Sequence, residues 1–388
     1  TTLKNNGNTY MSVDTNDAVT FATGGISVSS LNGGQLGGRR NIVYNGAMNV
    51  AQRSTSETGL GAASGYFTVD RFDTFTANSA GRFTMAQVAD VHDGFANCLK
   101  FTTTTADTSI AAGEYLGFTQ EFEGQDLQQL KKGSGDAESI TLSFYVKGNA
   151  SATYTVEMKD NDNDRINTQT FAVTTSWNRI KLTFAPDTTG TLDDDNASSL
   201  QISIWLHAGS DFTDGTFASN AWAARVSGNR VSPSATSIFD STSRTFFITG
   251  IQMELGDTAT PFEHRSYGTE LALCQRYYYR VTGQVAGDYI APNGYAISTT
   301  LAFGFVQFPV TMRTRPTAVE QSGTAADYKV IRCGLGTAAD CSAVPTFDNA
   351  GLTSARMIFT VSSGLSNGIA GSIQANNTSA YLGLSAEL

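Results

Sequence analysis

The sequence predicts an all-β chain with an extended N-terminal segment, a central antiparallel jelly-roll sandwich and a smaller C-terminal β-sandwich. The 388 residues include 38 Gly, 23 Phe and 14 Tyr, and only 15% are charged, fewer than long exposed helices carry. Short runs of alternating apolar and polar residues recur between Gly, Asn and Asp turn signals. At this length the chain can hold two or three domains, each with its own core.

Residues 1–40 are too poor in apolar side chains to close a core within one chain. The apolar residues of this segment lie in short alternating stretches: Val19, Phe21, Ile26, Val28 and Leu31. Burying them against identical segments of sister chains, as fibrous trimers do, is the physical solution, so the segment predicts a homotrimer. A flexible tail is the alternative interpretation, and it stays open.

Residues 41–265 carry the central sandwich. The stretch 138–148, ESITLSFYVKG, places Ile140, Leu142, Phe144 and Val146 on one face. The same alternation recurs in four more stretches: 152–160, 168–187, 199–209 and 244–256. Repeated strands of this kind, separated by turns, indicate an antiparallel sandwich, and we expect a jelly roll.

Residues 266–280 predict a linker with a short helix that begins near a capping-like Thr269 and runs into an aromatic run. The aromatic run is Tyr277, Tyr278, Tyr279 and Arg280. Residues 281–388 are again β-rich, with the clearest strands in 294–319, 355–364 and 380–388. They predict the smaller C-terminal sandwich.

The charge balance argues against nucleic acid as a partner. The net charge of −10 repels a phosphate backbone. No apolar run approaches the roughly 20 residues that a membrane helix needs, and the first thirty residues lack a secretion signal pattern. We therefore expect a soluble protein without membrane insertion.

The four cysteines are too few and too scattered for a disulfide framework. Cys333 and Cys341 can close one hairpin, or all four can be free thiols. No Cys-x-x-Cys is present and the three histidines lie far apart in the sequence, so neither a zinc nor a haem site is predicted. We expect no metal and no cofactor.

Two acidic patterns resemble sites with a chemical role. Asp160, Asp162 and Asp164 have the alternate spacing of a calcium loop, but Arg165 and Phe171 stand where that loop needs Gly and Glu. A polar hairpin loop is favoured there and in 191–198, and a loose Ca²⁺ site is the alternative.

The second pattern is Glu121 with Glu123, which could be imagined as a glycosidase acid pair. Carboxylates at such a spacing in a strand are more often solvated or ion-paired. We therefore predict no catalytic residue.

Aromatic and basic side chains are the candidates for binding sugars. Trp177 and Trp205 lie in apolar stretches and are expected in the core, whereas Trp222 is expected on an exposed loop. Three further candidates lie in 323–351, which is interpreted as long loops: Tyr328, Lys329 and Arg332. They offer a stacking ring and hydrogen-bond donors to a charged glycan.

Two stretches carry a resemblance to a known family. Residues 39–56, RRNIVYNGAMNVAQRSTS, and 65–75, GYFTVDRFDTF, resemble the opening of a domain found in phage tail-fibre and host-attachment proteins. Residues 246–280, FFITGIQMELGDTATPFEHRSYGTELALCQRYYYR, are similar to its closing strand. The match spans about 39–280. Residues 13–38 look like the thin segment by which such fibres join the particle, and 308–319 with 381–388 resemble fibre tips loosely.

The resemblance implies a carbohydrate-binding-module-like jelly roll in a non-enzymatic, homotrimeric tail-fibre subunit. The N-terminal segment would attach to phage tail or baseplate proteins, and 281–388 would be the receptor-binding tip for host surface polysaccharide. Tyr277 to Arg280 would form a seam between domains and between protomers, or contact a ligand. The location implied is the virion, after synthesis in the bacterial cytoplasm. A tail-spike depolymerase and a structural decoration or adaptor protein are the alternatives.

Overall fold

A computed structural model describes residues 2–5, 8–13, 19–21, 39–90, 92–333 and 337–388. Near the N-terminus, β1 (Thr2–Asn5), β2 (Asn8–Val13) and β3 (Val19–Phe21) form a three-stranded antiparallel sheet. Val19 and Phe21 belong to β3, whereas Ile26, Val28 and Leu31 lie outside the described residues. The homotrimer remains a prediction.

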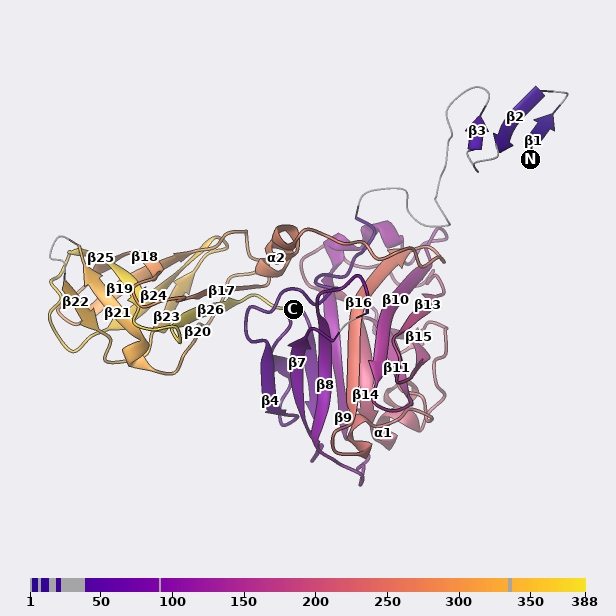
Figure 1. The fold of residues 1–388 in the computed structure, drawn as a ribbon, viewed down its shortest axis with the longest axis horizontal. Helices are drawn as coiled ribbons and strands as arrows, with labels where there is room; N and C mark the ends of the chain where they lie inside the picture. The colour runs from indigo at the N-terminus through magenta and orange to yellow at the C-terminus, as the bar shows by residue number, and fades with distance from the viewer. Residues whose placement is uncertain (1, 6–7, 14–18, 22–38, 91, 334–336) are drawn as a thin grey trace.

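The central domain is a sandwich of two antiparallel sheets (Figure 1). Its six-stranded sheet has the order β13-β10-β16-β8-β7-β4. These strands are β4 (Ser56–Leu60), β7 (Arg82–Val88), β8 (Cys98–Thr105), β10 (Ile140–Gly148), β13 (Asn178–Phe184) and β16 (Thr245–Leu255).

The second sheet of the central domain is seven-stranded and has the order β15-β12-β11-β14-β9-β6-β5. Its strands are β5 (Gly65–Tyr66), β6 (Asp73–Ala77), β9 (Tyr115–Glu123), β11 (Ala152–Asp160), β12 (Arg165–Val173), β14 (Ser198–Ala208) and β15 (Ala223–Ala224). The chain passes repeatedly from one sheet to the other, as in a jelly roll.

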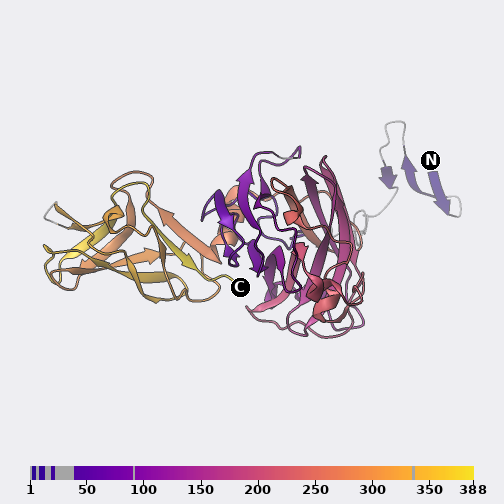
Figure 2. The ribbon, with the colours of Figure 1, turned by 90° about the horizontal axis from the view of Figure 1, so that it is seen from below.

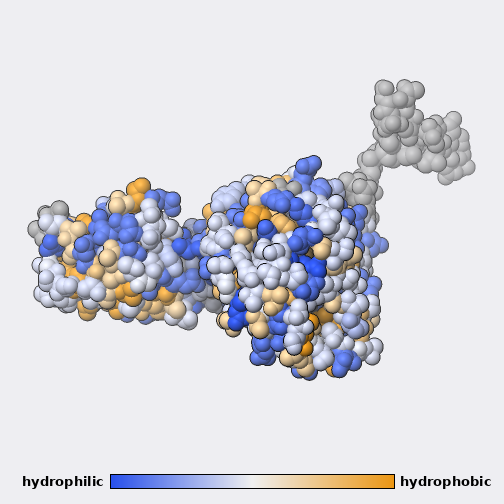
Figure 3. Space-filling model, turned by 60° about the horizontal axis from the view of Figure 1, so that its bottom comes forward, coloured by the Kyte–Doolittle hydropathy of each residue, from blue (hydrophilic) through white to orange (hydrophobic). Residues whose placement is uncertain are grey.

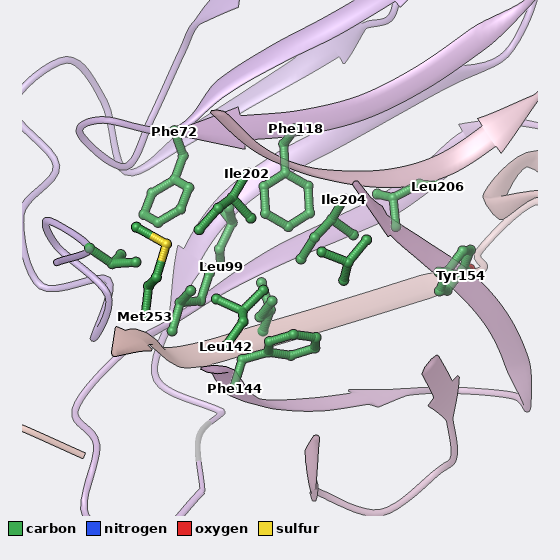
Figure 4. Close-up of a cluster of buried hydrophobic side chains, with 14 of the residues drawn as sticks. Phe72, Leu99, Phe118, Leu142, Phe144, Tyr154, Ile202, Ile204, Leu206 and Met253 are labelled. Carbon is green, nitrogen blue, oxygen red and sulfur yellow. The ribbon is translucent and has the colours of Figure 1, made fainter. Parts of the chain in front are cut away.

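The core of the central domain lies between the two sheets. Alternate residues of each strand point inward, which follows from the two-residue period of a β-strand. Leu142 and Phe144 of β10 meet Ile202 and Ile204 of β14 in this layer (Figure 4). Short helices close its ends: η1 (Gly124–Asp126), η2 (Gln128–Leu130), α1 (Ser210–Thr213), η3 (Ser227–Asn229) and η4 (Ile238–Asp240).

The C-terminal domain is a smaller sandwich with its own core. Its three-stranded sheet has the order β17-β26-β20, from β17 (Tyr278–Thr282), β20 (Glu320–Gln321) and β26 (Tyr381–Ser385). Its seven-stranded sheet has the order β22-β21-β25-β18-β19-β24-β23. The strands are β18 (Tyr289–Ala296), β19 (Leu301–Gln307), β21 (Tyr328–Arg332), β22 (Thr337–Asp340), β23 (Thr346–Ala350), β24 (Ser354–Thr360) and β25 (Ala370–Ala375).

The two sandwiches lie side by side and are joined by α2 (Tyr267–Gln275) (Figures 1 and 2). The backbone N–H of Thr269 donates to Ser266 Oγ at 3.3 Å, so Ser266 caps this helix and Thr269 does not. After β26 the chain returns to the central domain, where Leu388 packs against its core. The C-terminus therefore ends beside the central domain (Figure 1).

The interpretation of 323–351 as long loops was wrong. Within the described part of this stretch, η5 (Ala325–Asp327) leads into β21, and β22 and β23 follow. β21 lies between β22 and β25, and Val330 on it is core. Apolar alternation at Tyr328 and Val330 was the signal that the Gly and Ala content obscured.

Candidate functional site

A groove of about 420 Å³ lies on the outer face of the seven-stranded sheet of the central domain. We call it the Trp205 groove. Side chains from four strands and the segment after β14 line it: Phe75, Tyr115, Lys159, Gln201, Ser203, Trp205, Phe212, Arg225, Ser227 and Arg230. Aromatic rings and hydrogen-bonding groups therefore share one concave surface.

The pleat of β14 explains why this face is polar and aromatic. Ile202, Ile204 and Leu206 point into the core, so the intervening Ser203 and Trp205 point to the outer face. α1 and η3 follow β14 and β15, and they place Phe212 and Arg230 along the groove. The hydrophobic pattern of one face thus determines which residues line the other.

Trp205 forms the floor of the groove and is only 1% exposed. Its indole Nε1 donates to Glu157 Oε2 at 2.7 Å. Arg230 donates to both oxygens of the same carboxylate, each at 2.9 Å, and its guanidinium carbon lies 4.6 Å from the centroid of the Trp205 ring. Because the ring is covered and both partners are satisfied, Trp205 and Arg230 form a rigid base rather than a free stacking surface.

The half-buried rings of Phe75, Tyr115 and Phe212 form the aromatic wall of the groove. The Tyr115 centroid lies 6.0 Å from that of Phe75 and 5.1 Å from that of Phe212. Phe75 reaches this position because Gly117 has no side chain: a Cβ there would lie 2.3 Å from the Phe75 ring. These edges and faces are the surface that a planar or cyclic ligand would contact.

Lys159 supplies the groove with a positive charge. Within the described residues its ammonium makes no ion pair or hydrogen bond. Burial, together with the nearby positive charges of Arg230 and Arg225, lowers the pKa of Lys159 below its usual value. Beside it, Gln201 Nε2 donates to Ser203 Oγ at 3.0 Å, so amide and hydroxyl groups complete the floor.

Asp73 lies on the same sheet face, toward the C-terminal domain. Burial, together with the nearby negative charges of Glu121 and Glu387, raises the pKa of this carboxyl to about 7. Its Oδ1 is buried and has no hydrogen-bond partner in the described part of the chain. The carboxyl is therefore poised to hold a proton near neutral pH.

Trp222 is not an exposed loop residue. It is half-buried and packs against the central core. Its Nε1 donates to the Ala185 carbonyl at 2.8 Å, and Lys132 Nζ lies 5.3 Å from the ring centroid. The packing of the loop onto the sandwich, which its Gly and Ser content does not reveal, removes this ring from the surface.

The other two tryptophans differ from each other. Trp205 is buried as expected, although it lies on the outer sheet face rather than between the sheets. Trp177 precedes β13 and is only half-buried. Its ring centroid lies 6.3 Å from that of Phe247 and 5.3 Å from Lys147 Nζ. The expectation of a core position was wrong for Trp177.

Tyr328 is fully buried in the C-terminal core, so it cannot contact a glycan. Its hydroxyl donates to the Tyr381 carbonyl at 2.8 Å. Lys329 and Arg332 lie on the same strand and are half-buried, and Arg332 donates to the Gly364 carbonyl. These three candidates are brought together by β21, with the Tyr328 ring turned into the core and the other two side chains only half-buried.

The aromatic run lies where the two domains meet. Tyr277 belongs to the central core and is fully buried, and its hydroxyl donates to Glu123 Oε1 at 2.5 Å. Tyr278 is also fully buried and donates to Glu320 Oε2 at 2.7 Å. Tyr279 packs toward the C-terminal core, with its ring centroid 6.0 Å from that of Phe308.

Cations cover two of these rings, those of Tyr277 and Tyr278. The guanidinium carbons of Arg71 and Arg53 each lie 3.5 Å from a ring centroid, Arg71 over Tyr277 and Arg53 over Tyr278. Both arginines also pair with Glu387, near the end of the described chain. Arg280 donates to the Arg53 carbonyl. The rings of Tyr277 and Tyr278 are enclosed between the two domains, so they have no open face for a ligand, whereas Tyr279 is half-buried.

The acidic patterns have structural partners. Arg276 donates to both oxygens of Glu123, at 2.7 and 2.6 Å. Burial alone would raise the pKa of Glu123, but the hydrogen bonds from Arg276 and Tyr277 hold it below its usual value. Glu123 is therefore part of the domain junction.

Residues 161–164 are the turn of a hairpin, since Asp160 of β11 pairs with Arg165 of β12. The buried Asp160 carboxylate contacts the Lys132 ammonium, which also donates to the carbonyls of Thr189 and Gly190 at 3.0 and 2.9 Å. No group of three metal-ligating side chains gathers within the described ranges. All four cysteines, Cys98, Cys274, Cys333 and Cys341, are free thiols.

Sequence reasoning missed most of the groove. Phe75, Tyr115 and Phe212 are far apart in the chain, and each resembles an ordinary strand or loop aromatic. Phe75 and Tyr115 share one signal, since each alternates with core positions of its strand, as Phe75 does with Phe72 and Thr74; Phe212 lies in α1 and has no such signal. Recognising the set requires knowing that β6, β9 and β14 are neighbours.

Comparison with known proteins adds distant structural similarities. No protein-family model matches the chain, and no curated protein is significantly similar to it. Among solved structures, a carbohydrate-binding module described as CBM4 is 15% identical, with 54% of this chain and 97% of the module covered and a TM-score of 0.28. Within the described part, no helix is both long and apolar enough to cross a membrane.

Two further structures are similar at the same level. The family 11 carbohydrate-binding module of the Clostridium thermocellum cellulase Lic26A-Cel5E is 14% identical, covering 53% of this chain and 100% of the module, with a TM-score of 0.25. The enzymatically active domain of tailspike protein 4 of bacteriophage CBA120 is 12% identical, covering 55% of this chain and 21% of that one, with a TM-score of 0.28. Similarity this distant does not establish a function.

Proposed function

We propose that this chain is a polysaccharide-binding subunit of a phage tail fibre, and that the Trp205 groove is its principal sugar site. The observation that carries the binding proposal is the groove itself, in which three aromatic rings face amide, hydroxyl and ammonium donors across about 420 Å³. Sugars present both apolar C–H faces and hydroxyl groups, so they match a surface of this mixed kind. The virion part rests on the resemblance of 39–75 and 246–280 to the phage fibre domain.

The charge of the groove favours an acidic polysaccharide. Lys159 is not neutralised by a partner in the described part of the structure. Arg225 at the rim is only partly engaged, since it pairs with the exposed Asp164 at 2.5 Å. A carboxylate on the glycan would form ion pairs with both Lys159 and Arg225. Single contacts of this kind are weak, and repetition over the subunits of a fibre would supply avidity.

The binding proposal is tested by affinity electrophoresis of the full chain through gels that contain purified bacterial capsular and O-antigen polysaccharides. Tyr115→Ala and Lys159→Ala should each reduce the retardation roughly tenfold, because each removes one direct contact. Lys181→Ala removes an exposed cation of β13 on the opposite sheet and serves as the control. Unchanged retardation of both groove variants would remove the groove from this role.

The virion proposal needs its own measurements. Free protein should block adsorption of the phage that encodes it, by occupying the receptor. Light scattering should give the mass of a homotrimer for the full chain, and removal of 1–38 should leave both sandwiches folded while abolishing incorporation into particles. A chain that does not compete with the phage would instead be a structural decoration or adaptor protein.

A tail-spike depolymerase is the second candidate, and one observation favours it. Asp73, with a pKa raised to about 7, has the protonation state of a general acid and lies near Glu121. Its Oδ1 is buried, however, so this oxygen does not face a glycosidic bond on the surface. Incubating the protein with a polysaccharide that it binds and measuring new reducing ends separates the two, and shortened chains would establish the enzyme.

A further inference from the structure

An aromatic platform lies on the outer face of the C-terminal domain, remote in sequence from the Trp205 groove. On β19 and β24, Ala302, Met357 and Phe359 point into the C-terminal core. Phe303 and Phe305 alternate with these core positions and point outward. Tyr295 on the neighbouring β18 is 40% exposed. Apolar surface is interspersed with hydrophilic surface on this domain (Figure 3).

The register of the sheet brings three rings together. Tyr295 lies opposite Phe303 across the β18–β19 pair, and their centroids are 5.6 Å apart. The Tyr295 and Phe305 rings are nearly parallel, with an interplanar angle of 26° and centroids 6.2 Å apart. We define Tyr295, Phe303 and Phe305 as the platform.

Polar groups border the platform on the next two strands. Arg356 lies opposite Phe305 on β24, and Asn349 lies opposite Arg356 on β23. The Arg356 guanidinium carbon is 4.2 Å from the Phe303 centroid, and its Nε pairs with Asp348. Their side chains are 37% and 24% exposed, so both remain open to solvent.

A shallow cavity of about 260 Å³ adjoins the platform. Phe305 and Arg356 line one side of it, and Asn349, Gly351 and Ser354 line the other. The amide nitrogen of Asn349 and the hydroxyl of Ser354 make no hydrogen bond within the described residues. These free groups surround the space beside the Phe305 ring.

We propose that the platform and this cavity bind a neutral hexopyranose unit of a polysaccharide, as a second sugar site distinct from the Trp205 groove. The apolar face of the ring would stack on Tyr295 and Phe305. Its hydroxyls would bond to Arg356, Asp348, Asn349 and Ser354, which together offer donors and acceptors. Because Asp348 already neutralises Arg356, the site does not select an anion.

A second copy of the chain fits this face less well. Covering it with protein would bury the Arg356–Asp348 pair and the unpaired groups of Asn349 and Ser354, at a cost in desolvation. A hydroxylated ring supplies partners to the same groups. The inference shares with the proposed function only the class of ligand, so the two sites can be tested separately.

The test uses the full chain in affinity electrophoresis through gels containing dextran, galactan or mannan, which are polymers of glucose, galactose and mannose. At least one should retard the wild-type chain. Phe305→Ala and Tyr295→Ala should each weaken that retardation roughly tenfold, while Phe305→Tyr should keep it. Tyr289→Ala is the matched control, since Tyr289 is a 58% exposed tyrosine of the same strand outside the platform.

Each result decides between the sites. If the platform variants lose their retardation in the gel while Lys159→Ala keeps it, the second site is supported. If only Lys159→Ala loses its retardation, the proposed function stands and the platform proposal is overturned. The platform proposal is also overturned if none of the three polymers retards the wild-type chain. Variants that bind normally but show a lower mass by light scattering would identify the platform as a contact between copies, which also overturns it.

Discussion

Single residues in this molecule owe their chemistry to burial more than to their type. On a surface, Trp205 would be a stacking residue. Here it is 1% exposed and forms the base of the groove, where its indole donates to Glu157, which in turn accepts from Arg230. Tyr328 would be a ligand contact in a loop and is a core ring on β21. Asp73 shows the same effect on a titratable group, and this leads to a prediction on pH.

Asp73→Asn should stabilise the protein at neutral and higher pH. The folded carboxyl has its pKa raised to about 7, above the unfolded value near 3.9. The folded state therefore binds the extra proton between these values, and the wild-type chain loses stability as pH rises through them. The advantage of the variant should grow from pH 4 to pH 7 and then level off at about 1–2 kcal/mol, because the carboxyl is partly open to solvent.

Urea unfolding from pH 4 to pH 8 measures this difference. Asp194→Asn removes an exposed carboxylate and is the matched control. A difference between Asp73→Asn and wild type that stays constant over the range would contradict the raised pKa.

At the scale of elements, the groove depends on how closely neighbouring strands approach. β9 lies between β14 and β6, and Gly117 on β9 leaves the space that Phe75 fills. A Cβ at this position would also lie 2.5 Å from the Ile204 carbonyl oxygen. A methyl group at Gly117 would therefore force the Phe75 ring outward and press on the backbone of β14.

Gly117→Ala should therefore cost about 1–3 kcal/mol of stability and displace Phe75 from the groove wall. Polysaccharide binding should weaken along with stability. Gly135→Ala is the control, since nothing lies within 4 Å of its added Cβ. Thermal unfolding and affinity electrophoresis of both variants provide the measurement, and two variants that behave alike would refute the role of Gly117.

At the scale of the whole molecule, the domain junction fastens the end of the described chain back onto the central sandwich. Glu387 pairs with Arg53 and Arg71, whose side chains are 9% and 0% exposed. Arg313 donates to the carbonyls of Ala386 and Glu387, at 2.8 and 2.5 Å. The contacts join both domains into one unit, which would transmit a fixed orientation from the central domain to the C-terminal domain.

Glu387→Gln should destabilise this junction strongly. It leaves Arg71 buried without its charge partner, and breaking a buried pair in this way typically costs about 3–5 kcal/mol. Calorimetry should then resolve separate unfolding of the two domains. Lys131→Gln breaks an ion pair whose side chains are 53% and 38% exposed, and it should change stability by less than about 1 kcal/mol. A single unchanged transition in Glu387→Gln would show that the pair does not couple the domains.

The sequence by itself determined the β class, the strand-rich middle and the break into a second sandwich, because alternation and turn residues are local properties. Strands at 140–148, 152–160 and 245–255 follow directly from it. What only the tertiary structure decided is which outward-facing residues become neighbours. Phe75, Tyr115 and Lys159 meet because β6, β9, β14 and β11 are adjacent in one sheet, and long-range strand order leaves no trace in local periodicity. Burial of Tyr328 and Trp222 depends on the same order, since an aromatic side chain packs identically well against a core or a ligand.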